Sequence, residues 1–148
     1  GLCPFGKGAG PDRRRLSTMM SASVGDIHLC RAHDIRAGVR PIGAQLLVDR
    51  LWPRGISKTD LPLDAWLKDV APSPALRIWY GHDPAKWAEF GNRYRAELRD
   101  NPEAVESALA WCRGGPASLI YTAKDRLHTH ALVLRDHLAE TLAKEYAQ

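Results

Sequence analysis

The sequence is poor in cysteine and contains no long apolar run. Cys3, Cys30 and Cys112 are widely spaced, and no Cys-x-x-Cys pair occurs. This usage argues against a disulfide framework or a zinc site and is typical of a reducing cytoplasm. No apolar run approaches the roughly 20 residues of a transmembrane helix, and no apolar segment follows the N-terminal basic residues as in a signal peptide. We therefore expect a soluble, cytoplasmic protein with no membrane partner.

Several motifs that would reveal a function are also missing. There is no Walker loop, no Gly-x-Ser-x-Gly and no Gly-x-Gly-x-x-Gly. No two histidines stand four residues apart with a supporting carboxylate. The sequence therefore predicts no cofactor and no metal site.

Positive charge is concentrated in the first 22 residues, which carry +3 of the net +4, so the remainder is nearly neutral. This distribution is weak evidence for nucleic-acid binding. We expect residues 1–22 to be a disordered tail, and Met19 and Met20 are both plausible initiators within it. Residues 23–148 are expected to form a single domain.

Two apolar runs read as strands of a buried sheet. Residues 45–51 and 117–123 are mostly apolar, and residues 26–34 alternate as a further strand would. Because helical segments separate them, we predict an α/β domain with a small, at least partly parallel sheet. Segments 45–50 and 117–122 should be neighbouring parallel strands in its interior.

Start signals predict the helices. Asp60 could cap a short helix with Leu63, Trp66, Leu67 and Val70 on its buried face. Further helices are expected after Ser73-Pro74, Asp83-Pro84 and Asn101-Pro102, and from about Thr129.

The candidate site follows these two strands. Ligands in open α/β sheets bind beyond the carboxyl ends of the strands. One end carries "VDRLWPRG", in which Arg50 and Arg54 suit a phosphate or carboxylate and Gly55 would allow close backbone approach. The other end leads from "YTAKD" into a helix N-terminus. At these ends we predict two groups of residues. The ligand would be bound by Arg50, Arg54, Trp52 and Tyr121. Protons would be handled by His130, Asp125 and Lys124.

Three interpretations stay open for this cluster. It could form a small enzyme that acts on an anionic metabolite or nucleotide. It could bind an anion, or a nucleic-acid phosphate, without turnover. It could also be purely structural, with Arg50 or Arg54 paired to Asp49 or Asp125 and Trp52 filling the core.

The runs "VDRLWPRG" and "YTAKD…HTHALVL" closely resemble the YeaO-like branch of the bacterial DUF488 family over residues 27–140. The resemblance implies a compact cytoplasmic α/β protein without an established role. Other branches read Cys…Glu-Lys-Asp…Cys-His in the second run. This chain retains Lys124, Asp125 and His130 but has Tyr121, Ala123 and Thr129 at the other positions. It therefore lacks both cysteines that thiol chemistry would need.

Overall fold

The computed structural model describes residues 26–146. The predicted tail, residues 1–22, lies outside the described residues. Its disorder and the domain boundary at residue 23 therefore stay predictions.

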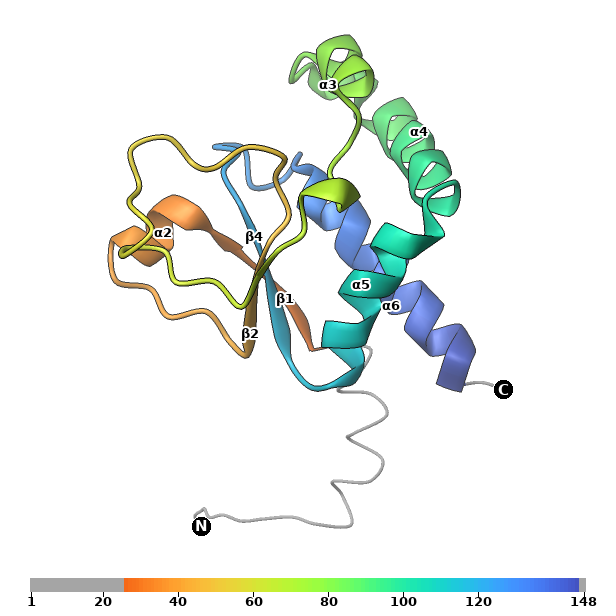
Figure 1. Ribbon diagram of the computed structural model, residues 1–148. Helices are drawn as coiled ribbons and strands as arrows, with labels where there is room; N and C mark the ends of the chain where they lie inside the picture. Colours follow the sequence, from red (N-terminus) through yellow and green to blue (C-terminus); the bar gives the residue numbers. More distant parts are fainter. Residues whose placement is uncertain (1–25, 147–148) are drawn as a thin grey trace.

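Four strands of the described chain form one parallel sheet in the order β1-β4-β2-β3. Figure 1 labels β1, β2 and β4 of this sheet. They are β1 (Ile27–Arg31), β2 (Ala44–Leu47), β3 (Ala65–Trp66) and β4 (Ala117–Tyr121). β4 lies between β1 and β2, with Leu119 opposite both Leu29 and Leu46. The predicted α/β class is confirmed, as is the pair of neighbouring parallel strands in the interior of the sheet.

Most of the predicted helix starts are confirmed. The Ser73 side chain accepts a hydrogen bond from the Leu76 amide, and Gly81 ends that helix in the left-handed region, with φ of 54°. Asp83 caps a short 3-10 turn that leads into the next helix. The elements are α3 (Pro74–Tyr80), η2 (Pro84–Lys86), α4 (Trp87–Arg99), α5 (Pro102–Arg113) and α6 (His130–Tyr146).

The helix predicted after Asp60 is wrong. That segment contains β3 and the 3-10 turn η1 (Lys68–Val70) instead. The reason is that its apolar residues serve two cores. Leu63 and Trp66 pack on one face of the sheet, whereas Leu67 and Val70 pack on the other. An extended chain can direct side chains to both faces, but a single helical stripe cannot.

All three predicted strands end earlier than expected, β4 at Tyr121 rather than at residue 123. β1 stops at Arg31, because Ala32 begins the short helix α2 (Ala32–Arg36). β2 stops at Leu47, although the Val48 amide still donates to the Ile120 carbonyl at 3.0 Å.

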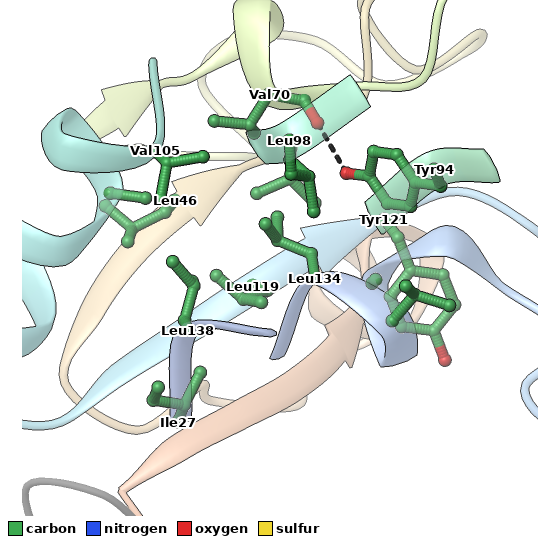
Figure 2. Packing of buried hydrophobic residues seen from close by; sticks show 14 of the residues in the cluster. Ile27, Leu46, Val70, Tyr94, Leu98, Val105, Leu119, Tyr121, Leu134 and Leu138 are labelled. Atoms are coloured by element: carbon green, nitrogen blue, oxygen red, sulfur yellow. Dashed lines mark hydrogen bonds between the residues drawn. The ribbon is translucent and has the colours of Figure 1, made fainter. Parts of the chain in front are cut away.

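The main core lies between the sheet and helices α4, α5 and α6 (Figure 2). Leu46 and Leu119 of the sheet meet Leu134 and Leu138 of α6, and all four are fully buried. A smaller cluster on the opposite face holds Leu47 and Ile120 together with α2 and the segment after β2. Each helix of residues 26–146 is too short or too polar to cross a membrane.

Candidate functional site

A cleft of about 630 Å³ opens beside the segments that follow β2 and β4. Parallel sheets commonly bind ligands at this end of their strands. Six of the seven predicted site residues line the cleft, namely Arg50, Trp52, Arg54, Lys124, Asp125 and His130. The structure therefore brings together side chains that lie up to 80 residues apart in the sequence.

The predicted residue that does not line the cleft is Tyr121. It packs in the main core and is almost fully buried (Figure 2). Burial raises the pKa of its phenol. Because alternate residues of a strand face opposite sides of a sheet, the last residue of β4 follows Leu119 into this core.

The expected role of Gly55 also needs correction. Gly55 does not line the cleft. Its φ of 76° explains the glycine, because this backbone conformation is costly for residues with a side chain. Its carbonyl accepts a hydrogen bond from Arg36 Nη1 at 2.8 Å. Gly55 thus serves the turn rather than the approach of a ligand.

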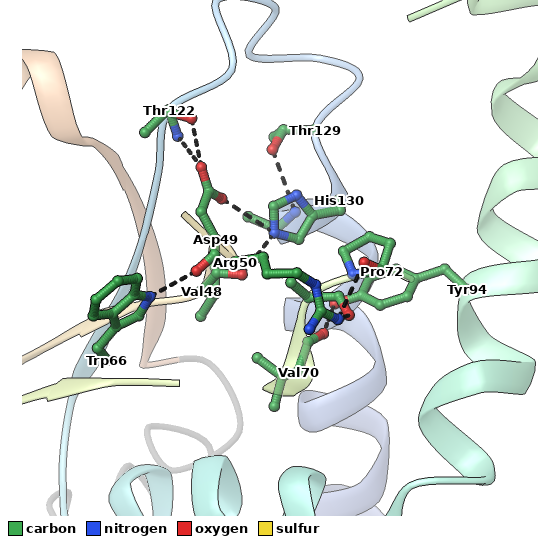
Figure 3. A network of polar contacts seen from close by, with 12 residues as sticks. Val48, Asp49, Arg50, Trp66, Val70, Pro72, Tyr94, Thr122, Thr129 and His130 are labelled. Atoms are coloured by element: carbon green, nitrogen blue, oxygen red, sulfur yellow. Dashed lines mark hydrogen bonds and ion pairs between the residues drawn. The ribbon is translucent and has the colours of Figure 1, made fainter. Parts of the chain in front are cut away.

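A network around Asp49 forms one wall of the cleft (Figure 3). Asp49 Oδ2 accepts hydrogen bonds from the Thr122 amide, at 3.1 Å, and from the Thr122 hydroxyl. The Asp49 carbonyl accepts from Trp66 Nε1 at 2.8 Å. These bonds tie the ends of β2, β3 and β4 together and fix the direction of the Asp49 carboxylate.

His130 joins the same network from the first residue of α6. Its Nε2 lies 3.0 Å from the Val48 carbonyl oxygen and 3.3 Å from Asp49 Oδ1. A carbonyl can only accept, so Nε2 carries the proton and directs it at Val48. Asp49 Oδ1 is consequently buried without a hydrogen-bond donor among the described residues. Burial lowers the pKa of His130, and the Asp49 carboxylate only partly offsets this, so the imidazole is neutral at pH 7.

Arg50 lies deepest of the cations in the cleft. Its Nη2 donates to the carbonyls of Ala71 and Pro72 at 3.2 and 3.4 Å, and its Nε is buried without a partner among the described residues. Backbone carbonyls orient the guanidinium but do not neutralise it. The structural interpretation requires Asp49 or Asp125 to pair with Arg50 or Arg54. No such pair is present within residues 26–146.

Three exposed cations complete the charged lining. Arg54, Arg77 and Lys124 make no ion pair and no side-chain hydrogen bond to any residue of the described range. With Arg50, four positive groups therefore face one cleft without a carboxylate partner from residues 26–146. Mutual repulsion in such a cleft is relieved when an anion binds.

Asp125 is already engaged within its own loop. Its Oδ1 accepts from the amides of Leu127 and His128, at 2.9 and 3.2 Å, and its Oδ2 lies 2.7 Å from His128 Nδ1. These contacts lower the pKa of Asp125, the His128 contact most. His128 itself is half-buried and contacts the edge of the Trp87 ring.

Sequence reasoning missed several lining residues, above all Arg77 and Thr122. Thr122 belongs to a segment that the sequence predicts as an apolar strand. Its hydrogen bonds with Asp49 could be predicted only if the register between β2 and β4 were known. Arg77 stands in the middle of a predicted helix without any motif. The structure shows that Arg77 is exposed and borders the cleft, but no local pattern in the sequence indicates either.

The described residues contain no group of three or more histidine, cysteine, aspartate or glutamate side chains that could hold a metal ion. The donor set of the cleft is instead suited to anions, because guanidinium and ammonium groups predominate in it.

The chain is similar to known proteins over most of its described part. Residues 26–148 match the family described as "Inactive DUF488-N3 subclade". The chain is 43% identical over 96 residues to "Uncharacterized protein YeaO" of Escherichia coli (strain K12), which covers 65% of this chain and 84% of that protein. It is 50% identical over 64 residues to "Uncharacterized protein Rv3073c" of Mycobacterium tuberculosis (strain ATCC 25618 / H37Rv), which covers 43% of this chain and 54% of that protein. No solved structure matches. The chain therefore belongs to the DUF488 family.

Proposed function

We propose that the protein binds a small phosphate- or carboxylate-bearing molecule in the cleft without turning it over. The observation that carries this proposal is the set of four cations, Arg50, Arg54, Arg77 and Lys124, that have no carboxylate partner within residues 26–146. An anion of two charges held between guanidinium forks would satisfy them.

Binding is favoured over catalysis by the contacts of the residues expected to handle protons. No hydrogen bond or ion pair within the described range joins His130, Asp125 and Lys124 to one another. The Asp125 carboxylate accepts hydrogen bonds from its own loop, and His130 Nε2 donates a hydrogen bond to the Val48 carbonyl. The word "Inactive" in the description of the subclade agrees with a site without turnover.

The test is calorimetric titration of the full chain with inorganic phosphate and with citrate, at low and high salt. Saturation at one site per chain, weakened by salt, is expected. At 100 times the dissociation constant the ligand should stabilise the fold by about 2.7 kcal/mol. Absence of binding to both anions would refute the proposal, and hydrolysis of a phosphate ester at this site would restore the enzymatic interpretation.

Arg54→Ala provides the decisive variant. Arg54 is exposed and makes no side-chain hydrogen bond or ion pair within residues 26–146, so its loss should weaken phosphate binding about tenfold, or about 1.4 kcal/mol. The free energy of unfolding should change by less than about 0.5 kcal/mol. Arg99→Ala is the matched control, because Arg99 is an exposed arginine at the end of α4 that does not line the cleft. Equal weakening by both variants would indicate general charge attraction rather than a site.

A further inference from the structure

We propose that the bound anion carries an aromatic ring, and that this ring occupies a second cavity that adjoins the cationic cleft. This inference rests on the proposed function, since it assigns the part of the ligand that the cations do not hold.

The second cavity has a volume of about 350 Å³. It shares five lining residues with the cleft, so the two spaces adjoin along a common wall formed by Pro72, Arg77, His82, Ala123 and His130. Volumes of this size are those of small-molecule sites. A ligand anchored by its charge in the cleft can therefore extend into the second cavity.

The second cavity has an apolar and aromatic part of its wall, formed by Pro74, Ile78, Tyr80 and Phe90, beside Arg77 and three histidines. Tyr80 and Phe90 form part of its wall, stacked on each other with ring centroids 4.5 Å apart. Trp87 stacks on Phe90 from α4, at 5.6 Å, and holds this pair in place. Tyr80 and Phe90 are almost fully buried, so the small surface that they expose is held rigidly, and a ligand ring can lie against it with little loss of conformational freedom.

Ile78 indicates that this surface lacks a covering group. It lines the second cavity, yet 81% of its surface is exposed. It is the most exposed of the large apolar side chains of residues 26–146. A ligand ring seated beside Ile78 would remove apolar area from water, which favours binding.

Arg77 stands on the boundary between the two spaces. It lines both, it is exposed, and it has no ion-pair partner within the described residues. A guanidinium plane can stack on an aromatic ring while its N–H groups bind an anion. Arg77 is therefore suited to hold a molecule in which the two groups are joined.

The experiment compares anions with and without a ring, using the full chain. Phenyl phosphate should bind at least tenfold more tightly than methyl phosphate in calorimetric titrations. Benzoate and acetate form a parallel pair, and a preference for benzoate alone would support the inference with a carboxylate as the anionic group.

Two variants locate the ring. Ile78→Ser should reduce the preference for phenyl phosphate about threefold and leave methyl phosphate binding unchanged. Val39→Ser is the control, because Val39 is β-branched and 51% exposed but lines neither cavity. It should change neither affinity.

The two proposals fail in different ways. If none of the four compounds binds, the proposed function is overturned and this inference with it. If methyl phosphate and acetate bind as tightly as their aromatic counterparts, only the inference is overturned. An unchanged preference in Ile78→Ser would likewise remove the ring from the second cavity while leaving the anion site intact.

Discussion

At the scale of single residues, the cleft depends on where each charge finds a partner. Asp49 has the carboxylate nearest in sequence to Arg50, yet it contacts Thr122 and His130 instead. Asp125 contacts His128. Because these contacts direct both carboxylates away from the arginines and from Lys124, the neighbouring cations keep their charge available. A buried carboxylate without these partners would be costly, by several kcal/mol.

His82 combines an unfavourable backbone conformation with a position in the wall of both cavities. It is the non-glycine residue of the described chain with positive φ, 55°, and it lines both cavities. Left-handed backbone costs a residue with a side chain about 1–2 kcal/mol. Such strain is commonly found at functional sites.

The substitution His82→Gly should therefore raise the free energy of unfolding by about 0.5–1 kcal/mol, measured by urea denaturation, because glycine adopts this backbone without strain. His82→Ala is the control, since it removes the imidazole but retains the strained Cβ. If the alanine variant gains as much stability as the glycine variant, backbone strain is not the cause.

At the scale of elements, α3 sets the position of the boundary between the cleft and the second cavity. It carries Arg77 and Ile78, and its start is tied to α4 by Ser73. The Ser73 amide and hydroxyl donate to the two carboxylate oxygens of Glu97, at 2.9 and 2.6 Å. The same hydroxyl oxygen accepts from the Leu76 amide at 3.1 Å. One side chain thus caps a helix and joins two helices.

Ser73→Ala should lower the free energy of unfolding by about 1–2 kcal/mol, because it removes the cap and leaves Glu97 with one donor fewer. Thermal or urea unfolding measures this directly. Ser107→Ala serves for comparison, since the Ser107 hydroxyl only donates to the Glu103 carbonyl within α5 and is exposed. A loss as large in Ser107→Ala would show that the cap at Ser73 is not special.

At the scale of the whole molecule, two partly or fully covered histidines link stability to pH. Burial lowers the pKa of His130 in the cleft wall. Burial also lowers the pKa of His137 on α6, and the nearby Arg95 adds to this effect. The unfolded chain, with histidine pKa values near about 6.5, therefore takes up protons at a higher pH than the folded chain. Stability from these groups is complete above about pH 6.5 and declines as the pH falls through and below that value.

We expect the free energy of unfolding to decrease between pH 7.5 and pH 5.5 in urea denaturation series. This range lies above the pKa values of carboxylates, so their titration does not contribute. His137→Gln should show a shallower decrease than the unsubstituted chain. Equal stability at the two pH values, or an unchanged slope in His137→Gln, would contradict the assignment of the decrease to these histidines.

The amino-acid sequence by itself determined the α/β class, the two interior strands and most helix starts. These features depend on local patterns, such as the apolar run of β4 and the cap-plus-proline at Ser73, which act over a few residues. It also indicated the strand ends as the place to expect a candidate site, which stays a prediction. Both runs that carry Arg50 and His130 do border the cleft.

Only the tertiary structure decided which charges are paired and which side chains face the same space. Tyr121 lies in the core because alternate residues of β4 face opposite sides of the sheet. The segment after Asp60 contains β3 because its apolar residues pack on both faces of the sheet. Arg77 lines the cleft because α3 packs on α4. Asp49 accepts hydrogen bonds from Thr122 because the register of β2 and β4 brings the two residues together. Such contacts join residues tens of positions apart, so their energies depend on packing that no local pattern specifies.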